Sequence, residues 1–340
     1  RAQPINLLPP ISWPGPISFT PDDDWLVFPW GDDRFGGGKQ VFFYPFNKAR
    51  PSVLHVLPKE PELRPHYFLP DGDRIVATTA GGELWLCDVS GDEPGAQMIW
   101  RNPAGQMSGS PPGPNGRFLL VNGFMELTAW VIPIDGSEPL FLGETEGCLG
   151  GLAMDPERNR VAVSGGFIKP DMSDDPIIRI HDLDNGEMRV LEAEGERGFY
   201  GLNFLPDNRL LSHGSEGLLL WDLNSGKYQS LSKREFLFAF DLDAQRRFFV
   251  IDTPEGATLW DLQEGTERIL PIASDHLLSL AISPDANFVV AGLDGGKILV
   301  LPLDSEDPHM LMGHDRSVAA VWVSPASDEI RSVSDDGTVF

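Results

Sequence analysis

Residues 211–223 read LSHGSEGLLLWDL, and residues 249–262 read FVIDTPEGATLWDL. Each stretch has an apolar segment, a turn that contains Gly, and a second apolar segment that ends in Trp-Asp-Leu. The apolar segments are short and rich in Val, Leu, Ile and Phe, which is typical of β-strands. A helical repeat would instead place its apolar residues at three- and four-residue spacing. The two stretches therefore predict antiparallel strand pairs that recur along the chain.

The same pattern repeats from end to end. It is marked by the turn after the first strand of each unit, at Pro21, Pro70, Pro114, Pro156, Pro206, Ala244, Pro284 and Pro325. The spacings between these positions are 49, 44, 42, 50, 38, 40 and 41 residues, which suits four short strands per unit. The repeat predicts an all-β propeller of eight blades with four antiparallel strands each. The alternatives are seven blades or part of a longer array.

The repeat also bears on domain organisation. It runs through every candidate boundary, so we expect residues 1–340 to form a single domain, although length alone would favour two. Residues 3–8, QPINLL, resemble the expected fourth strands at 138–142 and 308–312. The last unit stops on its third strand, so we expect the strand at 3–8 to complete the last blade and close its edge. We also expect the chain to be a fragment of a longer protein, because it begins with Arg and stops inside a repeat.

Several positions resemble the WD-repeat family. They are Trp221-Asp222, Trp260-Asp261, Gly313-His314 and the closing residues SVSDDGTVF. In that family, a His before the blade, a Ser or Thr on its second strand, an Asp in the next turn and a Trp on the third strand form a buried hydrogen-bond network. The resemblance implies this structural role for His314, Ser332 and Asp336, with the Trp of that unit falling just beyond Phe340.

Other units depart from the family pattern. Cys87-Asp88 and His181-Asp182 stand where Trp-Asp would be, and most units lack Gly-His. In this degeneracy the chain resembles bacterial proteins that carry a WD-type propeller on the C-terminal side of a serine/threonine kinase. The resemblance implies attachment to such a signalling protein, although nothing in residues 1–340 belongs to a kinase.

The charge restricts the class of partner. The chain has 26 basic and 51 acidic residues, a formal net charge of -25, and no basic cluster. Because phosphate binding needs concentrated Lys and Arg, nucleic acid and anionic membranes are poor partners, and we expect no nucleic acid and no membrane insertion within this chain. Proteins or peptides with basic patches fit better, although the acidity also serves solubility. No apolar run approaches a membrane span of about 18 residues. We expect a cytoplasmic location, or else the extracytoplasmic side of a membrane-anchored signalling protein.

The sequence contains no catalytic motif that we recognise. There is no G-x-S-x-G elbow, no phosphate-binding loop and no kinase sequence. The two cysteines, Cys87 and Cys148, are expected to be buried thiols. The seven His are scattered over different units, so no metal or cofactor is expected. Of two insertions, residues 31–40 and 165–176, the second echoes a calcium loop but has Pro176 where that loop needs Gly.

A binding propeller would use the loops that enter its first strands and the turns after its second strands, which share one face. The candidates at these positions are Cys148, Phe199, Tyr200, His276 and Arg316. Aromatic residues and Arg anchor interfaces, although for the two aromatic residues we favour packing of one blade on the next over contact with a partner. We therefore predict a non-catalytic protein-interaction or sensing module. The alternative is a lactonase-like propeller hydrolase with a site at the channel mouth.

Overall fold

The computed structural model describes a large part of the chain. The described residues are 5–6, 18–19, 25–30, 40–45, 53–56, 63–69, 73–90, 95–103, 107–109, 118–123, 128–144, 149–155, 157–165, 177–193, 198–214, 217–232, 240–253, 256–272, 276–305, 307–324 and 326–340. Their contacts divide the chain into two compact units. One unit is formed by Arg1–Trp13, Leu205–Asp207 and Arg234–Phe340, and the other by Pro14–Phe204 and Asn208–Lys233. Whether both belong to one domain stays a prediction.

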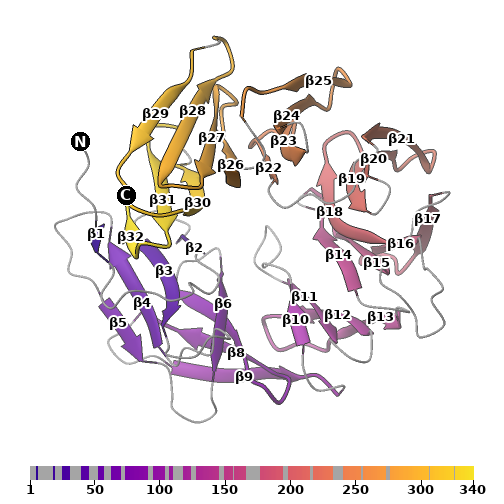
Figure 1. Cartoon of the computed structure of the whole chain (residues 1–340). Helices are drawn as coiled ribbons and strands as arrows, with labels where there is room; N and C mark the ends of the chain where they lie inside the picture. The colour runs from indigo at the N-terminus through magenta and orange to yellow at the C-terminus, as the bar shows by residue number, and fades with distance from the viewer. Residues whose placement is uncertain are drawn as a thin grey trace, which may run out of the picture. The chain divides into compact units, whose positions relative to one another are not determined.

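The unit that begins at Pro14 contains five four-stranded antiparallel sheets, each built from strands in chain order (Figure 1). The strands are β2 Ser18–Phe19, β3 Trp25–Trp30, β4 Gln40–Pro45, β5 Val53–Val56; β6 Arg64–Phe68, β7 Arg74–Thr78, β8 Glu83–Asp88, β9 Gly95–Arg101; β10 Met107–Gly109, β11 Phe118–Gly123, β12 Thr128–Pro133, β13 Leu140–Glu144; β14 Leu149–Met154, β15 Arg160–Gly165, β16 Ile177–Asp182, β17 Met188–Glu192; β18 Phe199–Leu205, β19 Arg209–Gly214, β20 Gly217–Asp222 and β21 Lys227–Ser232.

The other unit contains three such sheets. Their strands are β22 Phe240–Leu242, β23 Phe248–Thr253, β24 Gly256–Asp261, β25 Thr266–Ile269; β26 Leu277–Ile282, β27 Phe288–Leu293, β28 Lys297–Pro302, β29 His309–Met312; and β30 Val318–Val323, β31 Ile330–Ser334, β32 Thr338–Val339 with β1 Ile5–Asn6. In the last sheet, β1 pairs antiparallel with β32, with Ile5 opposite Val339. A strand from the start of the chain thus completes the sheet at its end.

Seven of the eight sheets formed by the described strands are meanders of four strands in chain order, and in the eighth β1 supplies the fourth strand, which is the blade architecture of β-propellers. The predicted all-β class and the predicted four-stranded antiparallel blade are confirmed. Side-chain burial is described along the full length of two or more strands in six sheets, those that begin at β6, β14, β18, β22, β26 and β30. Packing is therefore described most fully for these six.

The core of each unit lies between consecutive sheets. One cluster joins Ile178 of β16 to Trp221 of β20, and another joins Val250 of β23 to Leu299 of β28. Because both faces of the central strands are covered, β19 and β24 are buried almost throughout, whereas β21 and β25 at the outer edge are mostly exposed. The apolar segments at 211 and 249 read as near-continuous runs for this reason.

Buried polar side chains fix the turns after four of the first strands, β14, β22, β26 and β30. Ser283 Oγ accepts hydrogen bonds from the backbone N–H groups of Asn287 and Phe288, at 2.9 and 3.0 Å. Ser324, Asp155 and Asp243 accept backbone N–H groups in the corresponding turns. Three of these turns contain a non-glycine residue in the left-handed region, namely Arg246, Ala286 and Ser327. The side-chain caps offset that backbone strain, which explains the regular turn positions in the sequence.

Candidate functional site

The sheet formed by β30, β31, β32 and β1 contains a buried polar network around His314. His314 Nε2 lies 2.8 Å from Ser332 Oγ, and His314 Nδ1 lies 2.8 Å from Thr338 Oγ1 and 3.3 Å from Asp336 Oδ2. Asp336 Oδ2 also accepts the backbone N–H of Asp315 at 2.7 Å. The structure therefore brings together the three residues to which the WD-repeat resemblance gives a structural role.

The hydrogen bonds assign the proton positions in this network. Burial lowers the pKa of His314, and the carboxylate of Asp336 opposes that effect only in part, so the ring is neutral at pH 7. Thr338 Oγ1 donates to Asp336 Oδ1 at 2.5 Å, so it accepts from His314 Nδ1–H. Nε2 is then the acceptor for the Ser332 hydroxyl. Burial alone would raise the pKa of Asp336, but the hydrogen bonds from Thr338 and Asp315 outweigh it and lower that pKa.

The sheet formed by β18 to β21 contains the Trp and Ser of the hydrogen-bond network that the WD-repeat resemblance implies. Trp221 is fully buried on β20, and its Nε1–H donates to Ser212 Oγ on β19 at 2.8 Å. The Trp221 ring contacts Phe199 edge-on, with 6.1 Å between centroids, and Tyr228 on the outer strand at 4.9 Å. Trp221 thus has the structural position that the resemblance implies.

Trp260 occupies the matching place on β24 with a different partner set. The residue opposite Thr258, two positions before Trp260, is Ile251, so no hydroxyl stands where Ser212 does. Asp261 instead forms an ion pair with Arg247, whose Nη2 lies 2.5 Å from Asp261 Oδ2. Burial alone would raise the pKa of Asp261, but the hydrogen bond from Arg247 and the backbone N–H groups of the turn lower it.

The Asp that ends the third strands β8, β16, β20 and β24 caps the following turn. Asp222 Oδ1 accepts the backbone N–H of Asn224 at 2.9 Å, and Asp182 and Asp88 accept the same bond from the residue two positions on. The pairs Cys87-Asp88 and His181-Asp182 therefore retain the role of the Asp without the Trp. Cys87 is a fully buried free thiol, and burial raises its pKa to about 12, as expected for a structural cysteine.

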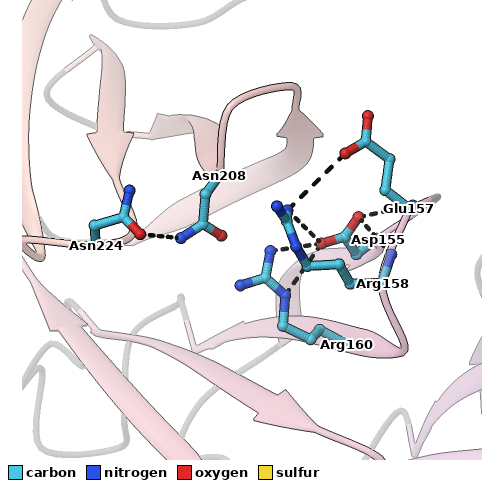
Figure 2. Close-up of polar contacts among 6 residues, drawn as sticks. All are labelled: Asp155, Glu157, Arg158, Arg160, Asn208 and Asn224. Atoms are coloured by element: carbon cyan, nitrogen blue, oxygen red, sulfur yellow. Dashed lines mark hydrogen bonds and ion pairs between the residues drawn. The ribbon is translucent and has the colours of Figure 1, made fainter.

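A polar cluster fixes the turn between β14 and β15. Figure 2 shows Arg158 and Arg160 converging on Asp155. Asp155 Oδ2 accepts hydrogen bonds from Nε and Nη2 of Arg160 at 3.1 and 2.6 Å. Its Oδ1 accepts a hydrogen bond from the backbone N–H of Glu157 at 2.9 Å. The Asp155 side chain is only 4% exposed, so every nearby cation and N–H group compensates its burial. The cluster is a structural clasp rather than a reactive site.

Next to this clasp, a side-chain hydrogen bond joins the turn before β19 to the residues that follow β20. Asn208 Nδ2 donates to Asn224 Oδ1 at 2.7 Å (Figure 2), and the backbone N–H of Leu223 donates to Asn208 O at 2.9 Å. The preceding sheet repeats both bonds, from Asn159 to Asp184 and from Leu183 to Asn159. This end of the two sheets is thus held by a repeated polar arrangement.

The opposite ends of β26 to β31 carry a connected surface that includes two predicted binding residues. His276 O accepts the backbone N–H of Asp294 at 2.7 Å, and Asp294 Oδ1 accepts the hydroxyl of Ser317 at 2.6 Å. Ser317 O in turn accepts the backbone N–H of Asp335 at 3.0 Å. The loops entering two first strands and the turns after two second strands are therefore bonded in series, and His276, Asp294 and Asp335 are exposed.

Arg316 lies on the same surface. Its side chain is exposed, and its carbonyl oxygen accepts the hydroxyl of Ser334 at 3.0 Å. Gly296, with φ +77°, presses against this loop, because a Cβ there would overlap His314 O. Hydrogen bonds from Ser317 and from the backbone of Gly295 keep the pKa of Asp294 low. We call the surface formed by His276, Asp294, Arg316 and Ser317 the loop face.

The other predicted binding residues are not part of the loop face. Phe199 is fully buried in the core and contacts Trp221, which agrees with the packing interpretation of this residue and not with its role as a binding residue. The backbone of Tyr200 lies in β18, but its side chain is outside the described residues, as is Cys148. Both stay predictions, as do the insertions at 31–40 and 165–176, most of which also lie outside the described ranges.

Sequence reasoning missed Asp294, Ser317 and Asp241. Asp241 on β22 accepts the backbone N–H of Ile282 in the next sheet at 3.0 Å, and burial raises its pKa to about 6. The sequence position of Asp294, in the turn after a second strand, could have predicted its place on the loop face. Asp241 left no signal, because its bond joins two sheets 41 residues apart in the chain.

Within the described parts of the chain, no three His, Cys, Asp or Glu side chains gather in a way that would hold a metal ion. The hydrolase alternative therefore gains no supporting observation. No described residue belongs to a helix long and apolar enough to cross a membrane.

Four-stranded antiparallel sheets, the His314 network and the Trp221 site support a WD-type β-propeller. A comparison with protein family descriptions gives no match to this chain. The chain is similar to a WD-repeat protein, the protein LST8 homolog of Drosophila melanogaster, with 32% identity over 90 residues. The similarity covers 24% of this chain and 29% of that protein, so the matched part spans under a third of the relative.

Proposed function

We propose that this chain is a non-catalytic protein-interaction module whose eight sheets are the blades of one propeller. The loop face carries the proposal. It combines the exposed side chains of His276, Asp294 and Arg316 on loops that the hydrogen bonds in series hold rigid. Exposed polar and cationic groups on rigid loops bind partners without an ordering cost. The β1 to β32 pairing and the repeat spacing support a closed ring.

The charge of the loop face indicates the chemistry of its partner. Asp294, Asp315 and Asp335 are exposed carboxylates beside Arg316, in a chain with a net charge of -25. A protein or peptide with a basic patch and at least one acidic group would pair with both signs of charge. Complementary charge of this kind mainly raises the association rate, which should fall with ionic strength.

The wider setting is part of the same proposal. The resemblance to propellers attached to bacterial serine/threonine kinases supports a role as the sensing part of a signalling protein in the cytoplasm. In such a protein, the loop face recruits the partner and the attached domain supplies the chemistry. The sequence of the complete gene tests this point directly, because the absence of a signalling domain would remove the attachment and leave the binding role.

The loop face is tested by affinity capture from cells followed by mass spectrometry. Arg316→Glu and Asp294→Lys should each lose partners that the wild-type chain retains, because each reverses one charge of the surface. Arg158→Glu is the matched control, since Arg158 is 44% exposed on a turn at the other end of a sheet. An unchanged partner set in both loop-face variants would reject this surface, while loss in the control alone would move the site to the other end.

A further inference from the structure

The outer strand β29 presents three consecutive apolar side chains to solvent. Met310, Leu311 and Met312 are 49%, 44% and 68% exposed. β29 is the last strand of its sheet, paired on one side with β28 and with no further strand on the other (Figure 1). Side chains alternate across a strand, so the three residues make both faces of this edge apolar.

Four other outer strands differ from β29 in their charges, whereas β5, with the sequence VLHV, shares its lack of charged residues. Arg101 lies on β9, Arg189 on β17, Lys227 on β21 and Arg268 on β25. β29 has the sequence HMLM, with no Lys, Arg, Asp or Glu. Charged residues on an edge strand prevent another strand from pairing with it. β29 lacks that protection while its neighbour β25 retains it.

The two ends of β29 are flanked by acidic groups. Asp304 and Asp307 are exposed in the connection from β28, and Asp315 is exposed just after the strand. The one charged residue on the paired strand β28 is Lys297, opposite Met312. A strand that occupies this edge therefore meets an apolar centre with carboxylates at both ends.

We propose that β29 is a docking edge for an extended segment of a partner protein that has an apolar centre and Lys or Arg at both ends. The segment adds a fifth strand to the sheet, with main-chain hydrogen bonds for affinity and apolar contacts to Met310, Leu311 and Met312. A second copy of this chain is disfavoured, because pairing β29 with itself would bring the acidic ends of two chains of charge -25 together. Asp315 flanks both surfaces, but none of the four residues that define the loop face lies on β29, so this site does not depend on the loop face.

The test uses fluorescein-labelled peptides and anisotropy at low and physiological salt. The probe is Lys-Lys-Val-Ile-Val-Thr-Val-Lys-Lys. One control peptide replaces its four Lys with Glu, and another replaces Ile and Thr with Pro, which keeps the charge but removes strand pairing. The protein variants are the double change Met310→Lys with Met312→Lys and, as the matched control, Ile269→Lys on β25, where Ile269 is 53% exposed. Thermal unfolding checks that both variants fold as the wild type does.

We expect the probe to bind the wild type at least about tenfold more tightly than either control peptide does, and the double variant to lose at least about tenfold in affinity. The Ile269→Lys variant should bind the probe as the wild type does. Equal binding of the Pro peptide, or equal loss in both variants, would reduce the interaction to general charge attraction and overturn the proposal. Sedimentation that shows a wild-type dimer and a monomeric double variant would assign the edge to a second copy, and would overturn it too. The capture experiment with Arg316→Glu tests the loop face, and the peptide measurement does not use that variant. The two proposals can therefore fail independently of each other.

Discussion

The sheet β18 to β21 and the last sheet, β30 to β32 with β1, place a serine hydroxyl at the same point but use it differently. Ser212 lies opposite Leu219, two residues before Trp221, and accepts the indole N–H of that Trp. Ser332 lies opposite Phe340, with which it exchanges two backbone hydrogen bonds, and donates to His314. The position that corresponds to Trp221 is two residues past Phe340.

The difference shows that the WD-type network consists of separable parts. A hydroxyl can donate one hydrogen bond and accept others, so one Ser serves a Trp on the third strand and a His before the blade. The sheet β18 to β21 has the Trp without the His, and the last sheet has the His, Asp and Thr around Ser332. Each part is buried and satisfied in its own sheet, which explains how units so degenerate in sequence form similar blades.

Removing Trp221 from the sheet β18 to β21 should have the largest effect on the free energy of unfolding. Trp221→Ala deletes a fully buried side chain that packs on Phe199 and Tyr228, and it should lower the free energy of unfolding by about 3–5 kcal/mol. Phe340→Ala is the counterpart in the last sheet, where the ring is half-buried against His314, and it should have a smaller effect.

Urea unfolding followed by circular dichroism measures both variants, and hydrogen exchange of β20 and β32 locates the loss. We expect Trp221→Ala to expose the amides of β19 and β20 before those of the last sheet. Equal destabilisation by Phe340→Ala would mean that Phe340 already substitutes for the missing Trp, and that the two sheets are not complementary halves.

The two buried histidines of these sheets should make different contributions to the loss of stability at acid pH. Burial lowers the pKa of His213 on β19 from 6.5 to about 4, whereas the effect of burial on His314 is opposed by Asp336. Below pH 6.5 the unfolded chain binds a proton that folded His213 does not. Its contribution is therefore complete above pH 6.5 and is lost as the pH falls toward 4, by about 3 kcal/mol in all.

Urea unfolding at pH 7.5, 5.5 and 4.5 measures this dependence in His213→Gln and His314→Gln. The first variant should flatten the acid loss of stability clearly, and the second should flatten it less. His213→Asn serves as a check on side-chain volume, because the His213 ring fills the space beside Gly201 where a Cβ would overlap it. An unchanged pH profile in both His213 variants would contradict a buried neutral ring.

The sequence predicted features that depend on the order of residues along one unit. The turns that follow the first strands recur because capping residues such as Ser283 and Ser324 must stand at a fixed distance from the strand they end. His314, Ser332 and Asp336 form their network within one unit, and the resemblance to the WD-repeat family implied their role. Strand class and blade composition followed from the same local periodicity.

Features that depend on neighbouring sheets could not be predicted from the sequence. Phe199, at the start of a strand, suited either a binding loop or the core, and only its burial in a cluster that includes Ile178 of the preceding sheet decides for the core. Ser317 bonds to Asp294 and Asp241 bonds to Ile282, each across two sheets. These contacts depend on how one blade lies on the next, which a single-unit pattern does not encode.

The smallest expected effect tests the two serines themselves. Ser212→Ala leaves the buried N–H of Trp221 without an acceptor, and Ser332→Ala leaves Nε2 of His314 without a donor, so each should cost about 1–3 kcal/mol. The cost of Ser212→Ala should shrink in a Trp221→Phe background, because Phe has no N–H to satisfy. The cost of Ser332→Ala should shrink likewise with His314→Phe, and not with Trp221→Phe. A Ser332→Ala cost that fell in the Trp221→Phe background would mean that the two hydroxyls belong to one coupled network, and the two sheets would then no longer be independent halves of one design.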